Sequence, residues 1–333
     1  MENIVSVVVI TYNQEEFIAR ALDSILMQKC SVPFEIIIGE DCSTDRTGEI
    51  CARYAEQYPD KITLFRNSPN KGLLNNYFDC ILACKGKYMV DCAGDDFWVD
   101  ERKIEKLYTL MEQHPDVTMA HTGYAVYNEN TGMASTPLGY QSEAYIKDGK
   151  SMLQDIICPK VPMIMMIQST MFRMKPLLEG YEEDTALFRN KDLPCEDMPI
   201  FAALASRGKI AYIPDITQYY SIGHDSLSNN IDETKQFHFV KRVTRLTNYL
   251  AEKYNIGSKA LDECLKVKAF ALIMHVFRTN KAELLSEYDN TIQSLHIQTD
   301  TKTNILRQAL KCKMLWWALL CVRKAFVGLK KLA

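Results

Sequence analysis

The sequence predicts an α/β protein built on a doubly wound parallel sheet, followed by a helical C-terminal region. Two observations support this fold class. Over residues 1–98, short β-branched runs alternate with segments of helical periodicity, and the connections between them are short. From about Asp232 the chain shows helical patterning to its end and no strand signal.

The first elements follow one another as strand, helix, strand and helix. Ile4 to Ile10 is a β-branched run, which predicts a strand buried on both faces. After a polar break, the apolar residues from Phe17 to Leu26 recur at helical spacing. Glu35 to Glu40 is the second predicted strand, and either Ser43 or Thr44 is placed to cap the next helix.

The alternation continues with a strand at Ile62 to Arg66, a helix from about Asn75 to Cys84 and a strand at Tyr88 to Cys92. In parallel doubly wound sheets, ligands bind beyond the carboxyl ends of the strands. The polar residues that follow these strands are therefore the first candidates for a functional site.

After Val117 the pattern is less regular. Strands are expected at Val117 to Tyr127, Ser169 to Arg173 and Lys209 to Ile213, with a helix from Glu196 to Arg207 before the last of them. This part of the chain is expected to complete the domain that the first strands begin.

Composition excludes several classes of protein. The net charge of −3 gives no general attraction to nucleic acid. The eleven cysteines are scattered without a Cys-x-x-Cys pair, which argues against a disulfide framework or a zinc site and favours a reducing cytoplasm. No signal-peptide pattern follows Met1. The Gly-rich fingerprints of dinucleotide-binding and P-loop proteins are absent from the sequence.

The sharpest local signal is Gly94-Asp95-Asp96, which follows a predicted buried strand. Two adjacent carboxylates repel each other unless a cation holds them, and Mg²⁺ or Mn²⁺ binds through one or two carboxylates plus phosphate oxygens. The alternative is a solvated turn that caps the next helix.

Three segments of the chain, taken in order, resemble the nucleotide-binding half of family 2 glycosyltransferases. They are VSVVVITYNQEEFIARALDSILMQ, EIIIGEDCSTDRT and NKGLLNNYFDCILACKGKYMVDCAGDDFW. The resemblance continues more weakly through Cys195-Glu196-Asp197 and the segment from Tyr219 to Ser228. It implies the GT-A fold, with a mixed sheet flanked by helices. Residues 1–230 would form the catalytic domain, with a nucleotide-binding half at 1–98 and an acceptor half at 99–230. Residues 231–333 would form the helical C-terminal region.

The resemblance implies a nucleotide site at the first two strand ends. Thr11 and Tyr12 would line the base pocket. Asp41, with Glu40 beside it, would accept a hydrogen bond from the base or ribose, and a carboxylate that accepts from a uracil N–H favours UDP. The alternative role for Asp41 is helix capping. Lys71, in the loop Asn70-Lys71-Gly72, and Gly94 would also approach the donor, although a lone lysine is equally compatible with a solvated charge.

The same resemblance implies a Mn²⁺ or Mg²⁺ ion. Asp95 would be the ligand that ends the family's D-x-D pattern, but the first acidic position of that pattern is Ala93 in this chain. The ion would then be held by Asp95, Asp96, the diphosphate and His224, unless His224 is only structural. Ser221 is a second departure, since relatives often carry Arg there.

Cys195-Glu196-Asp197 resembles the family's catalytic acidic pair. An acceptor hydroxyl is a poor nucleophile near neutral pH, so a carboxylate must take its proton as the new bond forms. Asp197 matches the base position best, with Glu196 as its neighbour. The alternative is that both are first-turn acidic residues that stabilise a helix.

These residues predict an inverting, metal-dependent glycosyltransferase that moves a hexosyl or N-acetylhexosaminyl group from a nucleotide-diphosphate donor, favoured as a UDP-sugar, to a hydroxyl of a glycan or lipid-linked acceptor. Ala93 and Ser221 keep open an alternative, a catalytically impaired nucleotide-sugar-binding subunit. A glycosidase also uses two carboxylates but needs no nucleotide pocket, so that class is disfavoured.

From Thr301 to Ala333 the chain has eight basic residues and no acidic one. The apolar stretch from Met314 to Val322 is too short to span a bilayer. Its Trp316-Trp317 pair with basic flanks predicts a basic amphipathic helix that lies in the headgroup region of the inner membrane. The protein would then be cytoplasmic and bound peripherally to that membrane. The alternative is a terminal helix whose tryptophans dock on the protein's own core.

Overall fold

The computed structural model describes residues 1–160, 165–223 and 232–330, with side chains up to Arg323. The chain divides into two units, Met1–His224 and Asp225–Ala333. The boundary expected from the sequence, between residues 230 and 231, lies a few residues after this division.

The first unit is built on a ten-stranded sheet. Its strands are β1 (Glu2–Thr11), β2 (Phe34–Glu40), β3 (Ile62–Arg66), β4 (Gly86–Asp91), β5 (Phe97–Trp98), β6 (Val117–Asn128), β7 (Met133–Ser135), β8 (Tyr145–Asp148), β9 (Thr170–Arg173) and β10 (Lys209–Ile222). The order is β3-β2-β1-β4-β9-β6-β10-β5, with β7 beside β6 and β8 beside β10. Strands β3, β2, β1 and β4 are parallel, whereas β9 runs antiparallel to both β4 and β6. The predicted α/β class with a mixed sheet is confirmed.

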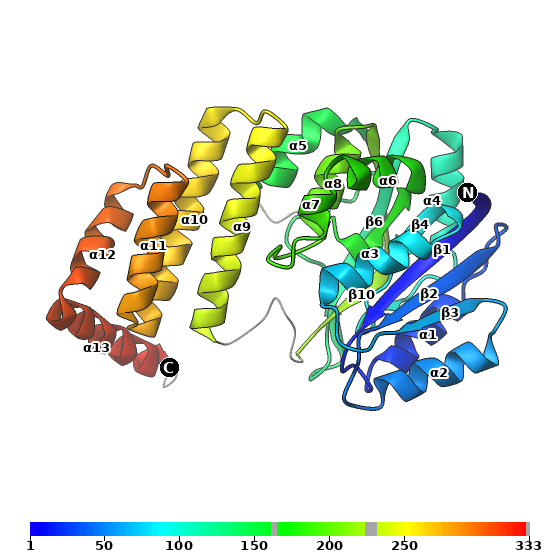
Figure 1. The fold of residues 1–333 in the computed structure, drawn as a ribbon, viewed down its shortest axis with the longest axis horizontal. Helices are drawn as coiled ribbons and strands as arrows, with labels where there is room; N and C mark the ends of the chain where they lie inside the picture. The colour runs from blue at the N-terminus through cyan, green and yellow to red at the C-terminus, as the bar shows by residue number, and fades with distance from the viewer. Residues whose placement is uncertain (161–164, 224–231, 331–333) are drawn as a thin grey trace. The chain divides into compact units, whose positions relative to one another are not determined.

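Helices cover both faces of this sheet (Figure 1). They are α1 (Ile18–Leu26), α2 (Thr47–Gln57), α3 (Leu73–Ala83), α4 (Lys103–Gln113), α5 (Gly149–Ile157), α6 (Met174–Glu183), α7 (Thr185–Phe188) and α8 (Asp197–Ala205). Helices α1, α2 and α4 share one hydrophobic core with Val5, Val7 and Val9 of β1. Helix α3 packs against β1 and β2. A Cβ at Gly39 of β2 would lie 2.5 Å from both Asn76 Oδ1 and Cys80 Sγ of α3, so glycine permits this close approach.

The order of the parallel strands creates a switch point. From β1 the chain moves outward through β2 and β3, then returns to β4 on the other side of β1. The connections that leave β1 and β4 therefore diverge, which opens a crevice at their carboxyl ends. Thr11 and the Gly94-Asp95-Asp96 turn lie at those ends.

Two local predictions were wrong. Neither Ser43 nor Thr44 caps α2, which begins at Thr47, because both residues bind the loop after β1 instead. Ser43 Oγ accepts from the Asn13 backbone N–H at 3.0 Å, and the Thr44 N–H donates to Asn13 Oδ1 at 2.8 Å. Strand β10 continues past Ile213 to Ile222, because a register irregularity between Ile213 and Ile216 interrupts the pairing without ending the strand.

The second unit is helical, as predicted, with α9 (Glu233–Lys253), α10 (Ser258–Thr279), α11 (Ala282–Ser294), α12 (Thr301–Lys311) and α13 (Lys313–Lys330). Trp316 of α13 is 3% exposed and packs in a core with residues of α9, α10, α11 and α12. Its indole N–H donates to Phe277 O at 2.9 Å. Trp317 is 66% exposed, so the two tryptophans have opposite environments.

In the described part of the chain, no helix combines the length and the apolar character needed to cross a bilayer.

Candidate active site

The end of β1 and the turn after β4 are packed against each other. Thr11 is buried, and its hydroxyl donates to Gln14 Oε1 at 2.7 Å. The Gly94 N–H donates to Ile10 O at 3.1 Å. A Cβ at Gly94 would lie 2.8 Å from Thr11 Oγ1, so a side chain there would push the two segments apart. Tyr12, which is 46% exposed, follows Thr11 at the rim of this junction.

Asp41, directly after β2, organises the loop that follows β3. Its Oδ1 accepts from the Lys71 N–H at 2.8 Å and from the Asn67 amide at 2.9 Å. Its Oδ2 accepts from the Gly72 N–H at 2.9 Å. The side chain is buried and makes none of the capping bonds of α2. Since a carboxylate has about four acceptor sites, these three bonds leave room for one ligand donor.

Glu40 and Lys71, the other two residues predicted for this region, bind groups of the protein itself. Glu40 is buried, and its Oε1 accepts from the Ser43 N–H at 2.6 Å, which shapes the turn after β2. The Lys71 ammonium pairs with Asp79 of α3 at 2.8 Å. Glu40 therefore shapes the turn beside Asp41, and Lys71 lies at the rim with its charge already paired.

Three carboxylates gather at the end of β4. Asp96 is 1% exposed, and its Oδ1 accepts from the Ser221 N–H at 2.9 Å. Its Oδ2 has no hydrogen-bond partner among the residues that the structure describes. Burial raises the pKa of Asp96 far above its usual range, and the charge of Asp95 adds to the rise. Burial also raises the pKa of Asp91 to about 7, again with a contribution from Asp95. These effects place Asp95, which is half-buried, within electrostatic reach of both.

A buried lysine lies behind these carboxylates. Lys103 of α4 donates from Nζ to Gln168 O at 2.6 Å and to Gln218 Oε1 at 2.7 Å. Burial lowers the pKa of Lys103 to about 7, against the opposing pull of Asp91 and Asp96. Sequence reasoning did not identify Lys103, because a lysine in the first turn of a helix is ordinarily exposed.

The donor set at the end of β4 suits a hard cation. Asp95 and Asp96 offer only oxygen donors, and Asp96 Oδ2 is buried without a partner in the described part of the chain. Within the described ranges, no three His, Cys, Asp or Glu side chains form a metal-binding group, so phosphate and water would have to complete the coordination. His224, the expected further ligand, lies outside the described residues.

The second acidic centre is at the start of α8. Asp197 is the first residue of that helix, and its Oδ1 accepts from the Met198 N–H at 2.6 Å. Burial raises the pKa of Glu196 to about 8, and the charges of Asp197 and Asp91 add to the rise. Tyr77 of α3 is fully buried, and burial together with the charges of Asp91 and Glu196 raises its pKa. Asp91, the last residue of β4, is therefore within electrostatic reach of Glu196 at the start of α8.

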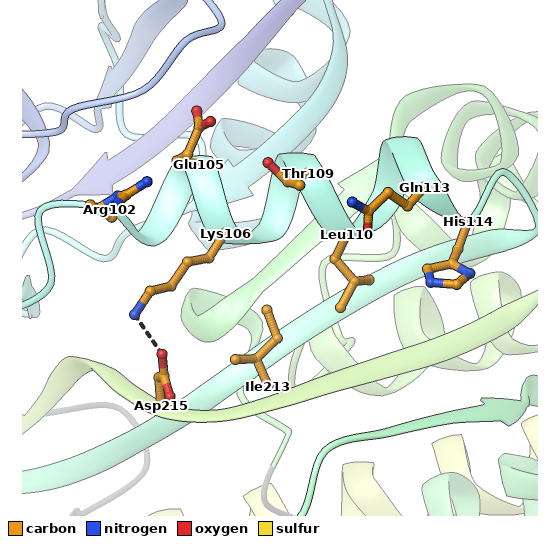
Figure 2. A pocket seen from close by; sticks show the side chains of 9 residues that line it. All are labelled: Arg102, Glu105, Lys106, Thr109, Leu110, Gln113, His114, Ile213 and Asp215. Carbon is orange, nitrogen blue, oxygen red and sulfur yellow. Dashed lines mark hydrogen bonds and ion pairs between the residues drawn. The ribbon is translucent and has the colours of Figure 1, made fainter.

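A separate cavity of about 550 Å³ lies between α4 and β10 (Figure 2). Lys106 lines it, and its ammonium donates to Asp100 Oδ2 at 2.6 Å and to Asp215 Oδ2 at 2.5 Å. None of the predicted site residues lines this cavity, and it has no role in the candidate site.

The family model described as glycosyl transferase family 2 matches residues 6–175. The uncharacterized protein Rv1520 of Mycobacterium tuberculosis is 36% identical over 133 residues, which cover 40% of this chain and only 38% of that protein. An uncharacterized glycosyltransferase of Haemophilus influenzae is 26% identical over 287 residues, or 84% of each chain.

Two solved structures are similar in fold. Residues 1–349 of S. aureus TarS in complex with UDP-GlcNAc match with a TM-score of 0.62 at 15% identity, over 94% of this chain and 88% of that one. The mannosyltransferase PcManGT from Pyrobaculum calidifontis in complex with GDP-Man and Mn²⁺ matches with a TM-score of 0.53 at 15% identity, over 96% and 86%. At these identities the likeness concerns the fold.

Proposed function

The chain belongs to glycosyl transferase family 2 and has the GT-A fold, and from that premise we propose that it is an inverting, metal-dependent transferase that moves a sugar from a UDP-sugar to a hydroxyl of a glycan or lipid-linked acceptor. The observation that carries this proposal is the electrostatic coupling of two acidic centres. Asp95 raises the pKa of Asp91, and Asp91 raises that of Glu196. These interactions support a single substrate site that draws on both centres.

Inversion requires the leaving diphosphate and the activating base to lie on opposite sides of the transferred sugar. Asp95 and Asp96 would hold the divalent cation, which when bound supplies Lewis-acid neutralisation of the leaving group. Asp197, from the other centre, would take the acceptor hydroxyl proton as the bond forms. With a pKa of about 8, Glu196 is mostly protonated at neutral pH, which makes Asp197 the better acceptor of that proton.

The nucleotide is assigned from the residues around β1 and β2. Asp41 retains an acceptor site for a uracil N–H, and the exposed Tyr12 ring is available to stack on the base. Thr11 and Gly94 would keep the loop and the turn close enough to enclose the ribose and diphosphate. TarS was solved with UDP-GlcNAc and PcManGT with GDP-Man, so the base has to be tested directly.

We place the enzyme on the cytoplasmic face of the inner membrane, attached through α13. Met314, Leu315, Trp317 and Val322 are exposed on this helix, and the segment from Thr301 carries no acidic residue. A lipid-linked acceptor would be within reach of an enzyme attached in this way.

A screen of nucleotide sugars by thermal shift, with and without Mn²⁺, tests the donor. UDP and UDP-sugars should raise the melting temperature most, and only with the metal. GDP acting as strongly as UDP would refute the base assignment. UDP release from the best donor separates a transferase from a binding subunit weakened at Ala93 and Ser221, because a binding subunit would release none.

A further inference from the structure

Arg20 of α1 places a guanidinium group beside the acidic turn, although the roles assigned so far do not use it. Its Nη2 lies 3.3 Å from Ser221 Oγ, and the Ser221 N–H is the group that holds Asp96. The guanidinium carbon lies 4.0 Å from the centre of the Phe97 ring, and Phe97 directly follows Asp96 in the chain. Arg20 is therefore adjacent to the expected position of the donor diphosphate.

The surroundings of Arg20 orient it without enclosing it. Glu129 at the end of β6 accepts from Nη2 at 2.5 Å and from Nη1 at 3.2 Å. The centre of the Tyr127 ring lies 5.7 Å from the guanidinium carbon, and this ring stacks on Tyr219. The Arg20 side chain remains 33% exposed. A guanidinium group that is held in one orientation and is still accessible to solvent is well suited to bind an anion.

A positively charged group at this edge of the sheet would favour donor binding. The acidic side chains of Asp91, Asp95 and Asp96 lie at the end of β4, where the negatively charged diphosphate is expected to bind. The Lys71 ammonium is paired with Asp79. Lys103 is fully buried, with its Nζ bound to Gln168 and Gln218. Neither lysine is placed as Arg20 is, beside the turn and partly exposed.

We propose that Arg20 binds the diphosphate of the nucleotide donor through its guanidinium group. Among the described residues, its partners use three of the five guanidinium N–H groups, so at least one Nη1 hydrogen is available for a phosphate oxygen. Glu129 would keep the fork in place while the phosphate binds. This inference rests on the proposed function, because it assigns a binding residue to the donor proposed there.

The competing role is structural, since the same ion pair ties α1 to the end of β6. Comparing UDP with uridine separates the two roles. Uridine has the base and ribose but no phosphate, so a residue that contacts only the diphosphate affects UDP binding alone. A residue that merely holds the site together affects both ligands.

The experiment measures the binding of UDP and uridine by calorimetry with Mn²⁺ present. Arg20→Ala should weaken UDP binding about tenfold or more, as expected for a charged hydrogen bond, and leave uridine binding unchanged. The matched control is Glu129→Gln, which removes the charge of the partner but keeps an amide oxygen that can still accept from the guanidinium and orient it, so UDP binding should persist. Ser221→Arg in the Arg20→Ala background brings a guanidinium back to the same place and should restore part of the UDP affinity.

If Arg20→Ala does not fold, Arg20→Lys can be used instead. It keeps the aliphatic side chain and the positive charge but lacks the planar guanidinium, so it should still weaken UDP binding and leave uridine binding unchanged. Equal losses of UDP and uridine binding would overturn the assignment, as would a Glu129→Gln variant that reproduces the loss of UDP binding. A wild-type protein that does not bind UDP would overturn the proposed donor, and this assignment with it. If the wild type binds UDP and the Arg20 variants bind it equally tightly, only the role of Arg20 is overturned.

Discussion

The Asp96 carboxylate accepts a hydrogen bond of 2.9 Å from the backbone N–H of Ser221, a residue 125 positions later in the chain. This bond joins the turn after β4 to the end of β10. It also draws Asp96 into the interior, so Asp95 is the more accessible of the two adjacent carboxylates. The pair is therefore asymmetric: Asp95 is partly exposed, whereas Asp96 ties the turn to the sheet.

Asp95→Asn should remove the metal dependence of UDP binding. In the wild-type protein, UDP should raise the melting temperature far more with Mn²⁺ or Mg²⁺ than with EDTA, because the cation links the carboxylate to the diphosphate. The variant should show the same small rise in both conditions. Thermal shift measures this, with Asp60→Asn, an exposed carboxylate in the turn before β3, as the control. Equal stabilisation of the wild type by UDP in EDTA would refute the metal site.

Asp197→Asn should lower kcat by about 10²–10⁴-fold and leave donor affinity nearly unchanged, because proton removal contributes only in the transition state. Glu196→Gln should cost less, since Glu196 with a pKa of about 8 is mostly protonated near neutral pH. Steady-state kinetics with a fixed acceptor and UDP binding by calorimetry measure the two effects. A reversed ranking would make Glu196 the base, and two near-normal variants would remove the start of α8 from the chemistry.

Glu196→Gln should stabilise the protein increasingly as pH rises. The pKa of Glu196 is raised from 4.5 to about 8 in the folded state. Between these values the folded protein keeps a proton that the unfolded chain releases, so wild-type stability falls as pH rises through this window. The neutral amide has no such dependence, and its advantage should reach on the order of 4 kcal/mol by about pH 8.

Urea unfolding of both proteins at about pH 5 and about pH 8 measures this difference. Asp91, whose pKa is raised to about 7, contributes with the same sign but is present in both proteins. An advantage of Glu196→Gln that stays constant over the window would show that Glu196 ionises normally in the folded state.

Much of the first unit could be predicted from the sequence because its signals are local. The β-branched runs of β1 to β4 and the periodic helices between them each depend on neighbouring residues alone. The short strands β5, β7 and β8 carry no pattern of their own and exist through pairing with β10 or β6. The positions of Asp41 and Asp95 at strand ends followed from the parallel order of the strands.

The contacts that complete the site could not be predicted in the same way. Arg20 meets Ser221 across 201 positions, and Lys103 meets Gln218 across 115. Contacts of this range depend on how distant strands pack, and no local pattern marks a lysine that becomes buried. The two tryptophans of α13 illustrate the same limit, since they are adjacent in sequence and only the packed structure distinguishes them.

The last prediction separates membrane attachment from core packing within one helix. Trp317 is exposed, as are Met314 and Leu315, whereas Trp316 fills the core of the second unit and its indole N–H bonds to Phe277 O. Trp317→Ala should therefore weaken binding to vesicles without changing the melting temperature, because it removes apolar surface that only a membrane would bury. Trp316→Ala should lower the stability of the second unit by about 3–5 kcal/mol, as expected for a buried tryptophan.

Vesicle flotation and thermal unfolding of both variants provide the measurement. Wild-type protein should float with vesicles rich in anionic lipid and much less with neutral ones, and salt should weaken the binding because charge attraction is screened over about 10 Å at 0.1 M. The tryptophan pair makes a better test than removing residues 314–333, because such a deletion also takes Trp316 out of the core. If Trp317→Ala floats as well as the wild type, the exposed face of α13 does not bind the membrane. If the wild type does not float at all, the proposed attachment through this helix is wrong.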